Sequence, residues 1–147
     1  MVFNIATEKG VRDAKSYLNY LQKQGLTIDI KPWKPRRSLR QNSFLHLILS
    51  ILAIELGETL EYTKQVIFKE IINTELFQYE RINPKTNISR VAWKSTRDLT
   101  TAEMTSAIER LRDYSNVELG IYLPSSNEKD SIIDMEIYVK NNNQFLH

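Results

Sequence analysis

A segment from Lys34 to Asn42 concentrates the side chains best suited to binding an anion. It reads Lys-Pro-Arg-Arg-Ser-Leu-Arg-Gln-Asn and stands directly before a long apolar stretch that predicts a helix. Free backbone amides at a helix N-terminus favour negative charge, and guanidinium groups beside them can make bidentate hydrogen bonds to phosphate oxygens. The candidate contacts to a phosphate backbone are therefore Lys34, Arg36, Arg37, Ser38, Arg40, Gln41 and Asn42.

Three of these residues also fit a purely structural role at the start of the helix. The Ser38 hydroxyl would accept from the Gln41 amide while the Gln41 side chain reaches back to Ser38, which is a capping box. Asn42 carries both a donor and an acceptor, so it is either a DNA contact or an exposed first-turn residue. Capping is the favoured interpretation for Ser38 and Gln41, and it is compatible with an anion at the same place.

Charge is segregated along the chain, although the net charge is only +2. No acidic residue occurs between Asp29 and Glu55 or between Glu80 and Asp98, and each of these basic windows holds five Lys or Arg residues. The rest of the chain carries ten basic and eighteen acidic residues, a net of −8. This distribution suits a polyanion met on one face, whereas two solvated basic loops are the alternative. The second window adds Arg90, Lys94 and Arg97 to the candidate contacts.

Each basic window contains one tryptophan, Trp33 beside Lys34 and Trp93 beside Lys94. Aromatic side chains stack on unpaired bases, which contributes roughly 1–3 kcal/mol per base. Trp93 ends an alternating strand pattern, which favours core packing. Trp33 lies between two prolines, so stacking and packing both stay open and we include it among the candidate contacts.

Few residues support catalysis. The chain has no cysteine, and His46 is the only internal histidine, so the sequence supports neither zinc binding nor Cys-His chemistry. His46 stands in an apolar helix and is interpreted as a packed core or interface residue. One enzymatic alternative is a Mg²⁺-dependent nuclease, because Asp29 and Lys31 resemble the Asp-x-Lys half of restriction-type sites. The other interpretation is a pair facing water, and we expect no catalytic residue, metal or cofactor.

The elements that position these residues predict an α+β fold, a small sheet or hairpin packed with four to five helices. Periodicity, caps and turn residues predict strands at 2–6, 26–30, 76–82 and 88–93, with a hairpin loop at 83–87. The same signals predict helices at 7–24, 38–56, 59–73, 100–119 and 125–140. We expect residues 1–140 to form a single domain and residues 141–147 to form a frayed tail.

The predicted helix from Ser38 to Leu56 is apolar nearly all round, so it must be covered on most sides. One small domain is not expected to cover it alone, which predicts a homodimer through this helix. The apolar run from Phe44 to Leu56 is shorter than the roughly 20 residues that span a bilayer. The sequence has no export signal near Met1 and no cysteine, which favours a cytoplasmic protein without a membrane partner.

The order Arg37-Ser38-Leu39, one residue, then Gln41-Asn42 at the head of a helix resembles the signature of the NinB (Orf) recombination proteins of lambda-like phages. A second stretch, Lys94 to Leu99, resembles that family's Ser-Thr-containing turn before another helix. The similarity extends over about residues 3–123. The sequence departs from the family pattern in the segment from Ser131 to Lys140, which is acidic and apolar here and not basic, so no DNA contact is assigned to the last helix.

The resemblance implies a NinB-like fold and a dimer that binds single-stranded DNA. It also implies a mediator that helps load recombinase onto strands coated by single-strand-binding protein, inside a bacterial host cell. We therefore expect a non-enzymatic accessory protein of phage-type homologous recombination. Two alternatives stay open: the nuclease using Asp29 and Lys31, and a pure protein-interaction factor of replication or recombination.

Overall fold

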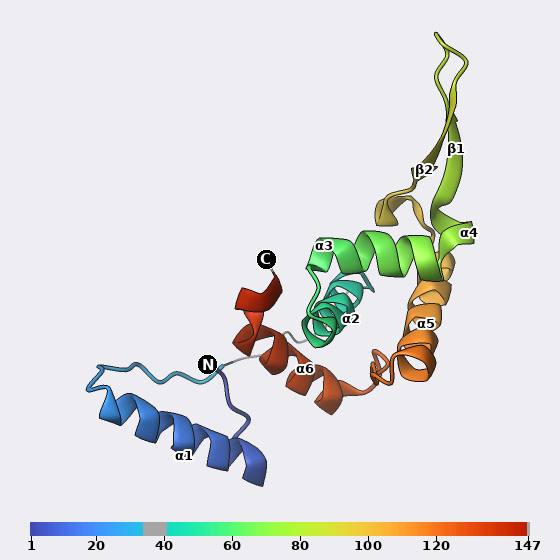
Figure 1. Cartoon of the computed structure of the whole chain (residues 1–147). Coiled ribbons are helices and arrows are strands. Elements are labelled where there is room, and N and C mark those ends of the chain that lie inside the picture. Colours follow the sequence, from blue (N-terminus) through green and yellow to red (C-terminus); the bar gives the residue numbers. More distant parts are fainter. Residues whose placement is uncertain (34–40, 147) are drawn as a thin grey trace.

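The structure, a computed structural model, describes residues 1–33 and 41–146. In chain order its elements are α1 (Glu8–Lys23), α2 (Gln41–Leu56), α3 (Leu60–Tyr62), the π-helix η1 (Thr63–Ile72), α4 (Thr74–Phe77), β1 (Gln78–Ile82), β2 (Ser89–Trp93), the 3-10 turn η2 (Thr96–Asp98), α5 (Thr101–Glu118), α6 (Lys129–Asn141) and the 3-10 turn η3 (Asn143–Leu146). The α+β class is as predicted, with helices predominating and the sheet confined to one hairpin (Figure 1).

Helix α2 forms the centre of the fold and is covered by α5, α6, η1 and η3 (Figure 1). Ile48 and Leu52 of α2 have no exposed surface. After the first turn of this helix, the exposed residues are His46 and Glu55. The buried residues of α2 are Phe44, Leu45, Leu47, Ile48, Leu49, Ser50, Ile51, Leu52 and Ala53. A single chain therefore covers this helix, and the dimer prediction loses the surface on which it was based.

The end of α2 follows its sequence signal. Gly57 has φ +68°, and the amides of Gly57 and Glu58 donate to Ile54 and Ala53 at 3.2 and 3.0 Å, which closes the last turn. The Thr59 hydroxyl then accepts from the Tyr62 amide and caps the next helix. Within the described ranges no single helix is long and apolar enough to cross a membrane, and the pair α2 with Leu60–Ile72, which passes that test jointly, is bent by 115°.

A tyrosine joins α6 to the last turn of α2. The Tyr138 hydroxyl donates to the Glu55 carboxylate at 2.7 Å. Burial and then this bond raise the pKa of Tyr138 to about 12. An unperturbed tyrosine has a pKa of about 10. Protonated Tyr138 therefore stabilises the fold fully below pH 10, and its contribution is lost as the pH rises through 12.

We expect Tyr138→Phe to remove the part of the alkaline loss of stability that comes from this hydroxyl. Urea unfolding at pH 9 and pH 11.5 measures it: the free energy of unfolding should fall less in the variant than in the wild type. Tyr20→Phe is the matched control, because Tyr20 is 56% exposed on α1. The linkage is contradicted if Tyr138→Phe and Tyr20→Phe lose the same free energy as the wild type.

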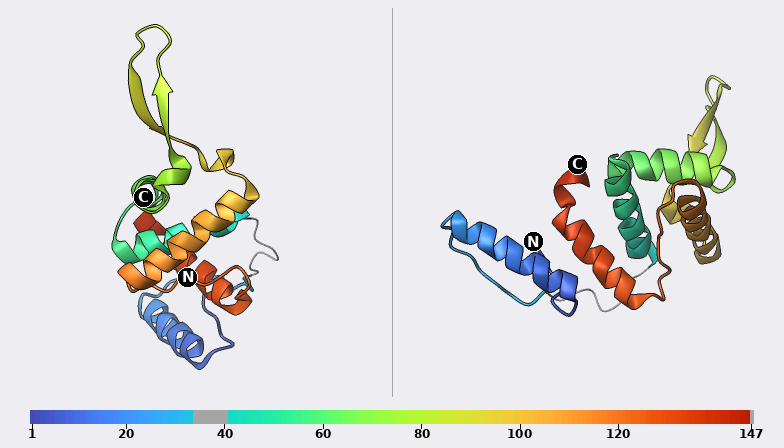
Figure 2. Two further views of the ribbon diagram at one scale, coloured as in Figure 1. Left: turned by 90° about the vertical axis from the view of Figure 1, so that its right-hand side faces the viewer. Right: turned by 60° about the horizontal axis from the view of Figure 1, so that its bottom comes forward.

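Helix α1 lies beside α6 and apart from the core (Figures 1 and 2). The Thr7 hydroxyl accepts from the Gly10 amide at 3.0 Å, and Gly25 with φ +65° follows the last turn, as predicted. A Cβ at Gly10 would lie 1.8 Å from the Asn4 carbonyl oxygen, so this tight start requires glycine. No residue of α1 is buried, and its apolar stripe stays half-buried or exposed, with Leu18 at 41%.

The strands predicted at 2–6 and 26–30 do not form. Val2 instead exchanges two hydrogen bonds with the Asn141 side chain at 2.6 and 2.7 Å, which attaches the N-terminal segment to α6. Leu26, Ile28 and Ile30 alternate as in a half-buried strand, yet all three are exposed. Alternation shows that one side of a segment is apolar, but a strand also needs a neighbouring strand, and the described chain supplies none for either segment.

The C-terminal region departs from expectation in two places. The Glu128 carboxylate accepts from the Ser125 amide and hydroxyl at 3.2 and 3.4 Å, but α6 begins after this pair and not at it. The tail, expected to be frayed, forms η3, in which Leu146 is buried against α2. A single apolar residue is enough to fold the tail back because the apolar surface of α2 is within reach.

Strands β1 and β2 form the predicted antiparallel hairpin. Asn83 and Asn87 close its loop: the Asn87 amide donates to the Asn83 carbonyl at 2.8 Å, and Asn87 has φ +55°. The first strand begins two residues later than predicted because Thr74–Phe77 forms the helical turn α4, whose Phe77 is fully buried. The hairpin projects away from the helical body in every view (Figures 1 and 2).

Candidate nucleic-acid interface

The structure describes the first basic window up to Trp33 and again from Gln41 onward. Trp33 is half-buried, Gln41 opens the described part of α2, and Asn42 is exposed in its first turn. The predicted contacts that lie outside the described residues are Lys34, Arg36, Arg37, Ser38 and Arg40. The Ser38 half of the predicted capping box lies there too, so Lys31 is the one basic residue of this window that the structure describes.

The side chain of Gln41 joins α2 to α5. Its amide nitrogen donates to the Thr101 carbonyl at 3.2 Å and to the Thr105 hydroxyl at 2.9 Å. Thr105 is in turn fixed, because its hydroxyl also donates to the Thr101 carbonyl at 2.9 Å. The amide nitrogen of Gln41 thus holds the first turn of α5 against the start of α2, a long-range role that capping logic did not predict.

The turn before α5 is built from two successive capping boxes. Ser95 and Asp98 form the first around η2, and Thr100 and Glu103 form the second at the start of α5. Hydrogen bonds from Thr100, with a smaller contribution from the nearby Lys94 ammonium, lower the pKa of Glu103. Reciprocal caps satisfy the free amides at each helix start. The backbone that carries Lys94 and Arg97 is therefore held firmly.

Gln41, in the first basic window, therefore lies beside the start of α5, the helix that follows the second basic window. Arg40 immediately precedes Gln41 in the sequence, and Lys94 and Arg97 immediately precede the α5 turn that Gln41 contacts. Arg97 is exposed and Lys94 is half-buried. We call this place the α2–α5 junction. It brings together residues that are about sixty positions apart in the sequence.

Arg90 stands farther out, on β2 of the projecting hairpin, and is exposed. Lys94 follows the end of β2, and its amide donates to the Phe77 carbonyl at 2.8 Å, which extends the pairing by one residue. Alternation along this strand puts Lys94 on the same face as Arg90. The second basic window therefore runs along one hairpin face from Arg90 to the junction.

The two tryptophans have different surroundings. Trp93 is half-buried and packs against the hydrophobic core cluster, so its interpretation as a core residue is confirmed. Trp33 is half-buried at the edge of the first window. Of the two tryptophans, Trp33 therefore stays a candidate for stacking on a base.

Two residues differ from the sequence interpretation. His46, expected to be a packed core or interface residue, is exposed on α2, although both of its neighbours in the chain, Leu45 and Leu47, are buried. Lys69 was not singled out, yet it is buried with its ammonium 5.5 Å from the centre of the Phe77 ring. Desolvation lowers the pKa of Lys69, with Lys64 adding to it. Its cation–π contact fastens η1 to the base of the hairpin.

The nuclease half-motif loses its structural support. Asp29 and Lys31 pair with each other at 3.0 Å, with side chains 71% and 76% exposed, on a segment that is not a strand. Among the described residues no three His, Cys, Asp or Glu side chains gather in a way that could hold a metal ion. The pair fits the alternative of an exposed ion pair facing water.

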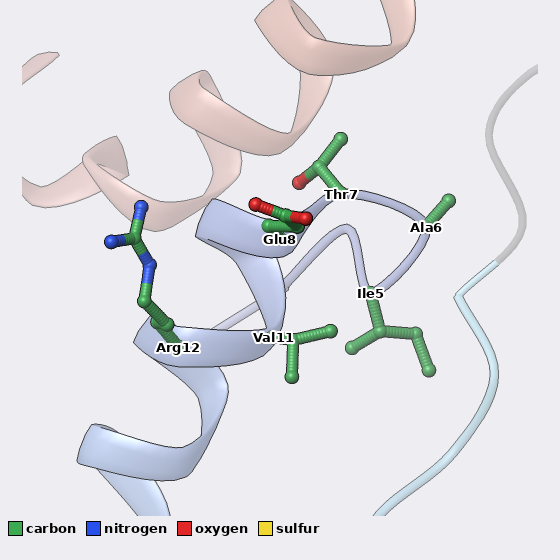
Figure 3. A pocket seen from close by; sticks show the side chains of 6 residues that line it. All are labelled: Ile5, Ala6, Thr7, Glu8, Val11 and Arg12. Atoms are coloured by element: carbon green, nitrogen blue, oxygen red, sulfur yellow. The ribbon is translucent and has the colours of Figure 1, made fainter.

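A wide hollow of about 460 Å³ lies at the start of α1, with its six lining side chains shown in Figure 3. It is lined by Ile5, Ala6, Thr7, Glu8, Val11 and Arg12. None of these is a predicted contact residue, and Glu8 and Arg12 bring opposite charges to it. The α2–α5 junction and the hairpin therefore hold Gln41, Arg90, Lys94 and Arg97, and the hollow holds none of the candidates.

In comparisons with known proteins, the chain matches no protein-family model, no curated protein and no solved structure.

Proposed function

We propose that this protein binds single-stranded DNA as a non-enzymatic accessory factor of phage-type homologous recombination. The observation that carries the proposal is the pair of hydrogen bonds from Gln41 to Thr101 and Thr105. They join the residue that follows Arg40 in the first basic window to the helix that follows the second. In this proposal the basic side chains that precede Gln41 and those that precede α5 neutralise consecutive phosphates of one strand.

Binding in this proposal is mainly electrostatic. Arg36, Arg37 and Arg40 supply guanidinium groups from the first window, while Lys94 and Arg97 supply the second. Trp33 adds stacking on an unpaired base as a smaller contribution. Dimerisation and a mediator role toward recombinase or single-strand-binding protein follow from the family resemblance and belong to the same proposal.

Binding to a single-stranded oligonucleotide is expected to weaken steeply with salt. Each neutralised phosphate on a single strand contributes about −0.7 to the slope of log K against log salt. If about five phosphates are engaged, the slope is about −3 to −4. Tryptophan fluorescence titrations with an unlabelled dT oligonucleotide over a range of NaCl concentrations measure this slope.

A duplex of the same length is the control ligand, and its binding should be weaker at every salt concentration. A slope near zero would overturn DNA binding in favour of a pure protein-interaction factor. A parallel gel assay uses a labelled single strand with and without Mg²⁺. Mg²⁺-dependent cleavage of that strand, abolished by Asp29→Asn, would overturn DNA binding without chemistry in favour of the nuclease. Intact strands with a steep slope are the result expected here.

A further inference from the structure

One face of the β-hairpin is rich in arginine and makes no contribution to the core. Side chains alternate between the two faces of a strand, and residues opposite each other in the register share a face. The register pairs Tyr79 with Ala92 and Arg81 with Arg90, which puts these four residues on one side. We call it the arginine face. Residues 78–91 are all exposed, so packing does not explain their identity.

Arg81 and Arg90 stand directly opposite each other in the antiparallel register. Directly opposite side chains have Cβ atoms about 4.5–5.5 Å apart, and like charges in that arrangement destabilise a hairpin. In the described ranges neither arginine makes an ion pair with an acidic residue. Glu80, the only carboxylate in the two strands, lies on the other face, where it accepts from the Ser89 hydroxyl. The protein therefore leaves this repulsion uncompensated, and an anion bound between the arginines would relieve it.

Tyr79 adds an aromatic ring to the same face. It is 41% exposed, and its partner across the strands is Ala92, a side chain too small to cover a ring. An exposed ring beside two guanidinium groups suits a nucleotide, because the ring stacks on a base while the guanidinium groups bind the adjoining phosphate. A duplex offers its phosphates but not the faces of its stacked bases, so a single strand fits better.

We infer that the arginine face is a second contact for single-stranded DNA, with Arg81 and Arg90 on phosphate and Tyr79 stacked on a base. The inference rests on the proposed function and extends it from the α2–α5 junction along the hairpin, through Lys94 on the same face. The projection of the hairpin from the helical body leaves this face open to a ligand (Figures 1 and 2). An isolated two-stranded hairpin is only marginally stable in water, so a bound strand would also order it.

The test compares three variants by titration with a dT oligonucleotide and with an abasic oligonucleotide of equal length. Arg81→Gln with Arg90→Gln should weaken binding about tenfold on both ligands and make the salt slope less negative by about 1.4. Its melting temperature should stay equal or rise, because the repulsion is removed. Tyr79→Ala should weaken binding to dT about fivefold, leave binding to the abasic strand unchanged and leave the salt slope unchanged.

Lys9→Gln with Arg12→Gln is the matched control, because it removes the same charge from exposed positions on α1. Control binding equal to the wild type, together with the losses above, supports the inference. If both hairpin variants bind DNA as tightly as the wild type, the arginine face is not a DNA contact, while the proposed function stands. A wild type without salt-sensitive binding overturns both. An equal loss of Tyr79→Ala on both ligands would exclude stacking at this position.

Discussion

Leu52→Asp is expected to unfold the protein, whereas His46→Asp in the same helix is expected to leave it folded. Leu52 has no exposed surface and packs inside the core cluster, while His46 is exposed. Removing a buried leucine side chain costs about 2–5 kcal/mol. A buried carboxylate without a partner adds several kcal/mol more. The sum approaches the whole stability of a typical domain, about 5–15 kcal/mol. Circular dichroism with urea unfolding measures both variants.

The same pair of variants tests whether α2 is a core helix or a subunit contact. Leu52→Ala gives a measurable intermediate case, because it is expected to stay folded with a free energy of unfolding lower by about 2–5 kcal/mol. Sedimentation of the wild type and of each variant reports the oligomeric state alongside. A Leu52→Asp variant that is well folded and monomeric, from a wild type that is dimeric, would contradict the core assignment and return α2 to the dimer interface.

Removing two arginines of the first window, or two basic residues of the second, is expected to weaken single-stranded DNA binding. Arg37→Ala with Arg40→Ala removes one pair, and Lys94→Ala with Arg97→Ala removes the other. Charge-assisted contacts of this kind predict a loss of about 1–3 kcal/mol for each pair. If the two windows meet at the α2–α5 junction, both pairs should matter on the same oligonucleotide. Fluorescence titration at one fixed salt concentration measures the losses.

Oligonucleotide length sharpens this comparison. A variant that combines all four substitutions gives the comparison. On a strand long enough to cross the junction, its loss of binding free energy should approach the sum of the losses of the two pair variants, since the pairs contact different phosphates. On a strand of only a few nucleotides, the same variant should lose less than that sum. Lys9→Ala with Arg12→Ala removes equal charge from α1 and should leave binding unchanged. Unchanged binding in either basic pair would remove that window from the site.

Local signals predicted the helix boundaries well. The hydroxyls of Thr7, Thr59 and Thr100 cap helices in the structure, and Gly25, Gly57 and Gly120 take positive φ after helix ends. The hairpin loop from Asn83 to Asn87 is also as predicted. These features depend on hydrogen bonds between residues only a few positions apart, and the residue types alone specify them.

The errors came from segments whose structure depends on distant neighbours. Leu26 and Ile30 alternate with polar residues, yet the described chain pairs no strand with them. The apolar neighbours of His46 predict a packed core or interface residue, whereas its side chain is exposed in the structure. Leu146 was assigned to a frayed tail, although it reaches an apolar surface and becomes buried. Periodicity shows which side chains are apolar, but it does not show which other element lies beside them.

For the candidate site, the sequence by itself determined the two acid-free basic windows, the residue types within them and the caps that start the adjoining helices. The tertiary structure alone decided that Gln41 lies against the start of α5, because its hydrogen bond to Thr101 joins residues far apart in the sequence. It also decided that Arg81 faces Arg90, since only strand register puts them opposite each other. The tertiary structure also decided that a single chain covers α2, because the burial of an apolar helix depends on the total surface that the neighbouring elements provide.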